Sequence, residues 1–160
     1  MKKILCILLI ISTVFAFSAC GGSKKAPEDY AMSKSLIELR TEISSKADLS
    51  EFFVLSGESL LDYTGITAES CTETLVLIPE SSISADMIFI IKAADSDALE
   101  NVKALLESYR DGRAAEFKSY APEEHQRLSD TKVNVKGLYL WMVVSENSAE
   151  IEKLIGESIN

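Results

Sequence analysis

The chain contains few of the residues from which catalytic and metal centres are most often built. Its 160 residues include one histidine, three cysteines and one tryptophan. With His125 alone, the chain can build neither a metal cluster ligated by several histidines nor a relay that needs a second histidine. The sequence therefore argues against those classes of enzyme.

Basic residues are also scarce relative to acidic ones. The chain has 16 lysines and arginines against 25 aspartates and glutamates, which gives a formal net charge of -9 at pH 7. Proteins bind nucleic acids by neutralising phosphates with lysine and arginine, so no nucleic-acid partner is expected.

No hydrophobic run is long enough to span a membrane. The longest, Ile4 to Phe17, has about 14 residues, whereas a spanning helix needs ~20. Two lysines precede this run, and Ser18 and Ala19 separate it from Cys20, which is the arrangement of an export signal. Residues 1–19 are therefore predicted to be a signal peptide.

The segment that ends at Cys20 resembles the lipobox of bacterial lipoproteins, with Phe17 where that pattern usually has leucine. The resemblance implies that Cys20 carries a diacylglyceryl thioether and that residues 20–29 form the lipidated cysteine and a flexible tether. We therefore expect a lipid-anchored protein at the extracytoplasmic face of the cell membrane. Ordinary secretion after cleavage at Ala19, or an uncleaved anchor, remains an alternative interpretation.

Cysteine usage excludes an intrachain disulfide if the lipid is present. Cys6 leaves with the signal peptide and Cys20 is modified, so Cys71 has no partner. Residues 30–160 must then fold on a hydrophobic core, and their length predicts a single domain.

Several segments of this domain have apolar residues at helical spacing. Asp95 or Ser96 is expected to cap the longest helix, Pro122 to start the next one, and Asn147 to cap the last in a capping-box-like arrangement with Glu150. The predicted helices are 31–45, 58–63, a long helix after Asp95, 123–128 and a final helix with Ile151, Leu154, Ile155 and Ile159 on its buried face.

Four other segments have the composition or alternation of strands. Glu73–Ile78 and Met87–Lys92 predict one antiparallel hairpin, and a second turns at Lys136-Gly137. Residues 47–56 allow either a short strand or a buried loop. The predicted fold class is α+β, with an antiparallel four-stranded sheet of two hairpins packed against helices on one face, in the order helices-ββ-α-ββ-α.

The order and spacing of several weak motifs resemble a family of small lipoproteins of Gram-positive anaerobes, whose domain is one of unknown function. The resemblance covers roughly Leu36 to Ile159, implies the lipoprotein setting and the α+β domain, and supplies no catalytic residues. The segments that carry it are Asp62-Tyr63-Thr64-Gly65-Ile66, Ile88 to Ser96, Tyr120 to Glu124, Lys136-Gly137-Leu138-Tyr139 and Val144-Ser145.

No residue pattern predicts a catalytic, metal or cofactor site. Cys71 and His125 would be the minimal nucleophilic pair, but a half-buried cysteine and a solvated histidine explain them better. Glu123-Glu124 favours a helix N-terminus, where negative charge is stabilised. Asp95-Ser96-Asp97 lacks the glycine and the terminal glutamate of a calcium loop, so helix capping accounts for it. We therefore expect a protein that is not an enzyme.

The candidate interaction surface is the pair Tyr139 and Trp141. They alternate with Leu138, Leu140 and Met142, so they lie on the opposite face of the predicted strand. If that face is open, the two aromatics form a recognition platform. The competing interpretation is that helices or loops cover both faces.

Together these observations predict a membrane-tethered, extracytoplasmic, noncatalytic module. It would bind an envelope protein or wall component through the open sheet face or a strand edge. The alternative is a small-ligand or metal-binding lipoprotein associated with a transporter. The expected partners are the membrane, through the lipid on Cys20, and an envelope protein.

Overall fold

The computed structural model describes residue 28 and residues 30–160 of the chain. The predicted signal peptide, residues 1–19, lies outside the described residues, as do Cys20 and most of the predicted tether. The structure therefore bears on the part of the chain that begins at Tyr30.

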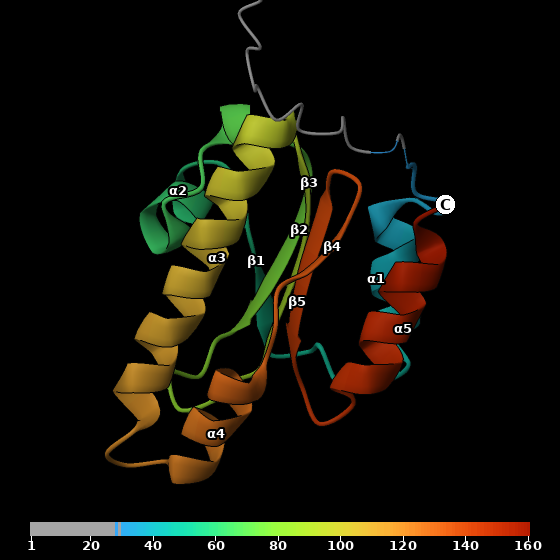
Figure 1. Ribbon diagram of the computed structural model, residues 1–160. Coiled ribbons are helices and arrows are strands. Elements are labelled where there is room, and N and C mark those ends of the chain that lie inside the picture. Colours follow the sequence, from blue (N-terminus) through green and yellow to red (C-terminus); the bar gives the residue numbers. More distant parts are fainter. Residues whose placement is uncertain (1–27, 29) are drawn as a thin grey trace, which may run out of the picture.

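A five-stranded antiparallel sheet lies at the centre of the fold (Figure 1). Its order is β1-β2-β3-β5-β4. The prediction of two antiparallel hairpins is confirmed, since β2 pairs with β3 and β4 with β5. The strands are β1 (Phe52–Leu55), β2 (Cys71–Pro79), β3 (Met87–Ala93), β4 (Asn134–Lys136) and β5 (Tyr139–Val144).

The predicted count of four strands is wrong, because the ambiguous segment 47–56 contains β1. Phe53 pairs with Ile78 and Leu55 with Val76, so β1 covers the edge that β2 would otherwise expose. Each pairing satisfies backbone groups that would lack partners in a buried loop. With four residues, β1 is too short to show a clear alternation in the sequence.

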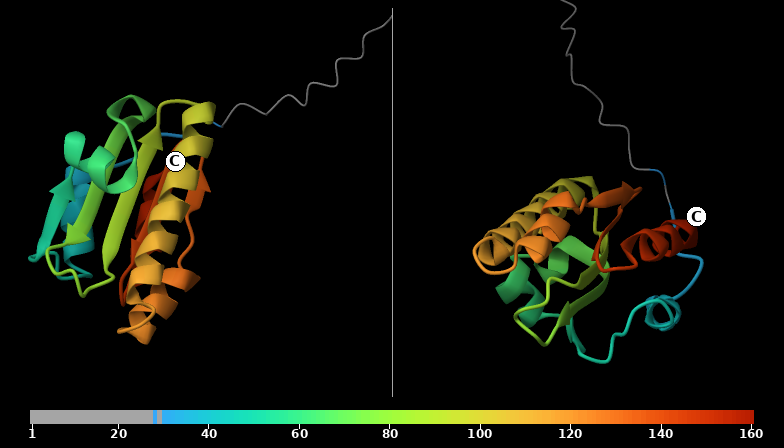
Figure 2. Two further views of the ribbon diagram at one scale, coloured as in Figure 1. Left: turned by 90° about the vertical axis from the view of Figure 1, so that its left-hand side faces the viewer. Right: turned by 90° about the horizontal axis from the view of Figure 1, so that it is seen from below.

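Helices cover both faces of the sheet, which corrects the prediction that they cover one. Figure 2 shows the sheet seen from its end, with α3 and α4 on one side and α1 and α5 on the other. The helices are α1 (Leu36–Ser44), α2 (Glu58–Thr64), α3 (Ser96–Phe117), α4 (Pro122–Asp130) and α5 (Ser148–Ser158), with a 3-10 turn at Ala68–Ser70.

The physical reason for two covered faces is the composition of the central strands. Successive residues of a strand point to opposite faces, and β3 is apolar at both. Phe89 and Ile91 enter the core under α2, α3 and α4, whereas Ile88 and Ile90 enter the core under α1 and α5. A sheet with one face in water would place polar residues at alternate positions.

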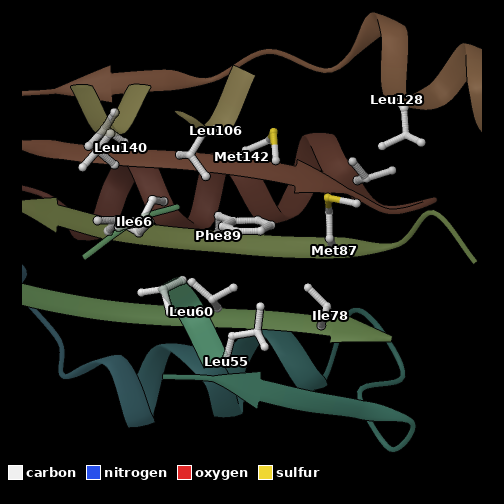
Figure 3. Close-up of a cluster of buried hydrophobic side chains, with 14 of the residues drawn as sticks. Leu55, Leu60, Ile66, Ile78, Met87, Phe89, Leu106, Leu128, Leu140 and Met142 are labelled. Carbon is white, nitrogen blue, oxygen red and sulfur yellow. The ribbon is translucent and has the colours of Figure 1, made fainter. Parts of the chain in front are cut away.

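The larger core lies between the sheet and α2, α3 and α4 (Figure 3). Phe89 is at its centre and is fully buried. Val102, Leu106 and Phe117 reach this core from α3. Burying side chains of this size stabilises a fold by about 1.5–3 kcal/mol each, which compensates for the absence of a disulfide among the described residues.

The predicted starts of α3 and α4 are confirmed, whereas α1 begins at Leu36, after the predicted start at residue 31. The Asp95 carboxylate accepts hydrogen bonds from the backbone N–H groups of Asp97 and Ala98, at 3.0 and 2.8 Å, and so starts α3. Pro122 is the first residue of α4. Asn147 precedes α5, but its side chain donates to the carbonyl oxygen of Lys46 instead of capping the helix.

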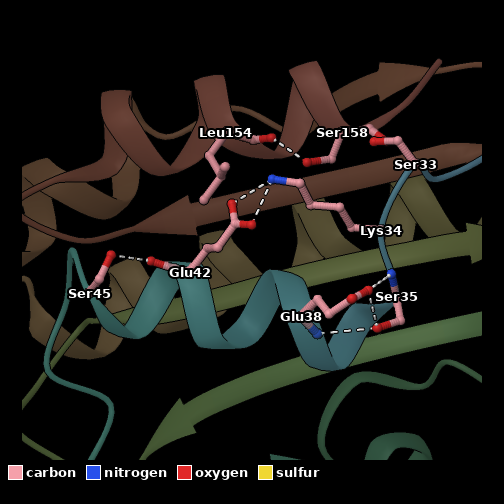
Figure 4. Close-up of polar contacts among 8 residues, drawn as sticks. All are labelled: Ser33, Lys34, Ser35, Glu38, Glu42, Ser45, Leu154 and Ser158. Atoms are coloured by element: carbon pink, nitrogen blue, oxygen red, sulfur yellow. Dashed lines mark hydrogen bonds and ion pairs between the residues drawn. The ribbon is translucent and has the colours of Figure 1, made fainter.

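The segment that begins at Tyr30 is fixed to the end of α5. Ala31 exchanges two backbone hydrogen bonds with Asn160, and the Ser33 N–H donates to the Ser158 carbonyl oxygen at 2.7 Å. Figure 4 shows Ser33 beside Ser158, and Ser35 and Glu38 in a capping box that starts α1. We call residues 30–33 the entry segment.

The β4–β5 turn lies against the entry segment. Lys136 pairs with Tyr139, so the two-residue turn is Gly137-Leu138, one residue later than predicted. Gly137 has a φ of 60°, which other residues adopt only with strain. A Cβ atom at this glycine would lie 2.6 Å from the Tyr30 ring, so the turn closes tightly on the entry segment.

Candidate functional site

Tyr139 is buried, so it is not part of an exposed platform. It is 1% exposed, in the core under α1 and α5. Its hydroxyl donates to the Glu73 carboxylate at 3.1 Å and accepts from the Met32 N–H at 3.2 Å. The Lys92 ammonium lies 5.0 Å from the ring centroid and 3.3 Å from the Glu73 carboxylate. Tyr139 therefore connects the entry segment to the sheet.

Trp141 is also covered, with 8% of its surface exposed. A Cβ atom at Gly156 of α5 would lie 3.7 Å from Cζ2 of its ring, so the helix packs closely on the indole. Its Nε1 is buried and has no hydrogen-bond partner among the described residues. The interpretation in which both faces of the sheet are covered is the one observed, and the open-face platform is wrong.

Cys71 and His125 lie at opposite ends of α3. Cys71 pairs with Ala93, just before the first turn of that helix. His125 donates from Nδ1 to the Ala114 carbonyl oxygen at 2.8 Å, about 27 Å further along the helix axis. Burial raises the pKa of the Cys71 thiol, which the hydroxyl of Ser70 partly offsets. The structure does not bring the two residues together as a nucleophile and base.

A mainly apolar hollow lies between α2, α3 and the loop after β2. Its volume is about 480 Å³, within the range of about 300–1,000 Å³ typical of small-molecule sites. We call it the aromatic pocket. It is lined by Phe53, Asp62, Tyr63, Ile78, Pro79, Glu80, Ser81, Ser82, Met87, Tyr109, Arg113 and Glu116.

Three aromatic rings form its walls. Phe53 and Tyr63 meet edge to face with ring centroids 6.3 Å apart, and Tyr109 packs on the core residue Phe89 at 5.5 Å. Ile78 and Met87 line it from the sheet, and Figure 3 shows them at the same end of the core. Tyr63 is 54% exposed, so the aromatic surface extends outward from the pocket.

The hydroxyl of Tyr109 lies in a partly buried environment. Burial raises the pKa of Tyr109; Arg113 opposes this shift, while Glu116 and Tyr63 add to it. Tyr109 therefore lies close enough to Arg113, Glu116 and Tyr63 for these groups to influence its pKa. Within residues 30–160, neither tyrosine hydroxyl has a hydrogen-bond partner, so both are available to a ligand.

Negative charge predominates among the charged lining residues, which are three carboxylates and one guanidinium. Arg113 is ion-paired with Glu116 and lies 5.0 Å from the centroid of the Phe117 ring. Asp62 and Glu80 have no ion-pair partner in the described part of the chain. The pocket can thus hold an apolar group and attract positive charge, but it opposes an anion.

Sequence reasoning missed this pocket because its residues come from five separate segments. The only local signal is on α3, where Tyr109, Arg113 and Glu116 follow at steps of four and three and so share one helix face. The helical spacing places Tyr109 on the apolar face of this helix, but it identifies no partner across the fold.

The described residues contain no group of three or more histidine, cysteine, aspartate or glutamate side chains placed to hold a metal ion. None of the helices in residues 30–160 combines the length and apolarity required to cross a membrane.

No curated protein and no solved structure matched the chain. A family model matches residues 44–145, which include the whole sheet, α2, α3, α4 and every residue that lines the aromatic pocket. Helix α5 and nearly all of α1 lie outside the matched range. The chain belongs to the family described as a domain of unknown function, DUF4358.

Proposed function

We propose that the protein is a lipoprotein, anchored through Cys20 at the extracytoplasmic face of the cell membrane, and that its domain is a noncatalytic binding module for an envelope protein or wall component. The observation that carries this proposal is the placement of the aromatic pocket relative to the entry segment.

The register of the strands fixes that placement. The entry segment lies against Gly137, at the end of the sheet where Lys92 pairs with Tyr139. The pocket is lined by Pro79 and Met87, at the other end of β2 and β3. The length of β3 separates the two ends by about 20 Å. A tether that enters at one end leaves the pocket directed away from the membrane, where a partner can reach it.

The covered faces of the sheet also favour this site. Helices α1 and α5 cover one face of the sheet, and α2, α3 and α4 cover the other. The pocket combines three aromatic side chains with open space. Val54 on the edge strand β1 and Leu61 on α2 are exposed and come from the elements that border it. Aromatic residues contribute much of the energy at protein interfaces.

The lipid anchor is tested by fractionating cells and labelling them with a fatty acid. The protein is expected in the membrane fraction with the label attached, and Cys20→Ala is expected to remove the label and release the protein from the membrane. Crosslinking in intact cells then tests the binding function. An unlabelled protein, or one that captures no envelope component, contradicts the corresponding half of the proposal.

A second candidate function is a small-ligand lipoprotein that serves a transporter, and the pocket volume of about 480 Å³ favours it. A thermal-shift screen separates the two candidates. A ligand at a hundred times its dissociation constant adds about 2.7 kcal/mol to the free energy of unfolding. A shift with a free metabolite supports the second candidate, and capture of an envelope component without such a shift supports the first.

A further inference from the structure

We propose that the aromatic pocket binds a primary ammonium group on an aliphatic stem, the chemistry of a lysine side chain. This inference rests on the proposed function, because it names what the binding module holds. It follows from the charge, the walls and the free hydroxyls of the pocket.

The charge of the pocket selects a cation. Asp62 and Glu80 lie on the rim without ion-pair partners among the described residues, and the charge of Arg113 is compensated by Glu116. An entering ammonium group would gain two favourable Coulomb interactions without displacing an existing ion pair. A carboxylate or phosphate would meet uncompensated negative charge.

The walls select an aliphatic stem that carries this charge. Phe53, Tyr63 and Tyr109 present apolar ring surface, against which a chain of methylene groups packs while its ammonium stays near the rim. A cation near the face of a tyrosine or phenylalanine ring is also attracted by the quadrupole of the ring. The hydroxyls of Tyr63 and Tyr109 are acceptors for the ammonium N–H donors.

Two sources present this group outside the membrane: a lysine of an envelope protein and a diamino acid in a wall peptide. The test uses both as probes, namely a short peptide with one lysine between apolar residues, and a purified wall peptide that carries a free side-chain amine. The same lysine peptide with an acetylated amine is the matched probe without charge.

Binding is measured by calorimetry on the full lipoprotein in detergent. The lysine peptide is expected to bind, and more weakly as salt rises. Acetylation of its amine is expected to weaken binding at least tenfold. A wall peptide that binds at least tenfold tighter than the lysine peptide identifies the wall as the source, and the reverse order identifies a protein.

Variants of the rim give the decisive comparison. Asp62→Asn and Glu80→Gln are each expected to weaken binding about two- to fivefold, the size typical of exposed charge pairs. Glu58→Gln, on the same helix as Asp62 but outside the pocket lining, is the control and is expected to leave the affinity unchanged. Tyr63→Ala is expected to weaken binding several-fold, with folding checked by circular dichroism.

The inference is overturned if neither amine probe binds, if the acetylated peptide binds as well as the charged one, or if the double variant at Asp62 and Glu80 keeps its affinity. Crosslinking distinguishes failure of this ammonium site from failure of the proposed binding function. If crosslinking captures the same envelope partner with this double variant as with the natural chain, the binding module stands and the ammonium site does not.

Discussion

The hydroxyl of Tyr139 accepts a hydrogen bond from the backbone N–H of Met32, across 107 positions of sequence. The same hydroxyl donates to Glu73 on β2. One buried side chain thus joins the entry segment, the central sheet and the last hairpin strand. Because both hydrogen bonds are made within the domain, the Tyr139 hydroxyl is not available to a binding partner.

Removal of this hydroxyl is expected to destabilise the domain. Tyr139→Phe keeps the ring but leaves the Met32 N–H and the Glu73 carboxylate without this partner, so the free energy of unfolding should fall by about 1–2 kcal/mol. Urea unfolding measures the change. Tyr120→Phe is the control, because its exposed hydroxyl has no partner in the described part of the chain. Equal losses in the two variants would contradict the role assigned to Tyr139.

Substitutions at two glycines are expected to change the stability of the fold in opposite directions. Gly137→Ala places a Cβ 2.6 Å from the Tyr30 ring and 2.8 Å from the Glu28 carbonyl oxygen at a φ of 60°, so it should cost about 1–3 kcal/mol. Gly112→Ala has no atom within 4 Å of the new Cβ and lies inside α3, so it should stabilise the fold by about 0.5–1 kcal/mol.

Thermal unfolding of both variants checks the pair. The entry segment must shift to accommodate the methyl group that Gly137→Ala adds, so faster amide hydrogen exchange is also expected at Ala31 and Met32 in that variant only. A neutral effect of Gly137→Ala would show that the turn and the entry segment are not tightly packed.

The Cys71 thiol is expected to be a poor nucleophile. Burial raises its pKa, so the thiolate fraction at neutral pH is lower than in a free cysteine. Alkylation by iodoacetamide at pH 7.5 should be slower in the native protein than in the same chain unfolded in urea. Peptide mass spectrometry resolves Cys71 from the other cysteines, and a native rate at or above the unfolded rate would reopen a chemical role for it.

The capping box of α1 predicts that the stability of the fold depends on pH. Hydrogen bonds from the backbone N–H and the hydroxyl of Ser35 hold the pKa of Glu38 below its ordinary value of 4.5. A carboxylate with a lowered folded pKa stabilises the fold above the ordinary value, and this contribution is lost as the pH falls through the folded pKa. The natural chain should therefore be more stable than Glu38→Gln at pH 7, and the difference should shrink below about pH 4.5.

Melting temperatures of both proteins from pH 7 to pH 3 measure this difference. Glu69→Gln is the matched control, since Glu69 makes no hydrogen bond or ion pair within residues 30–160. A difference between the natural chain and Glu38→Gln that is constant over this range would exclude the capping box as its origin.

Local structure is predictable from the sequence where capping residues and alternation coincide. Asp95 and Pro122 start the helices assigned to them, and Gly65 ends α2 in the left-handed conformation. Strand β1 could not be assigned, because its four residues acquire a strand conformation by pairing with β2. Tertiary pairing, not local pattern, decides such short segments.

A signal for two covered faces is present in the sequence. Leu75–Ile78 and Met87–Ile91 are uninterrupted apolar runs, which are typical of strands buried on both sides. In β5, the alternation of Tyr139 and Trp141 with Leu140 and Met142 suggests that the two aromatic residues face solvent. Both are large and mostly apolar, and both are buried. The aromatic pocket has no comparable signal, because the register of β1 on β2 brings Phe53 to Ile78 and packing of α2 on α3 brings Tyr63 to Tyr109.

The pairing of Ala31 with Asn160 has a practical consequence for labelling the molecule. Both residues lie at the end of the sheet that carries the Gly137 turn. A fluorophore or fusion domain attached after Asn160 would therefore crowd the entry segment and leave the aromatic pocket open. A label in the exposed loop at Ile83 would report directly on occupancy at the other end. Energy transfer from a donor at each position to acceptor lipids in a bilayer would compare the distances of the two ends of the sheet from the membrane.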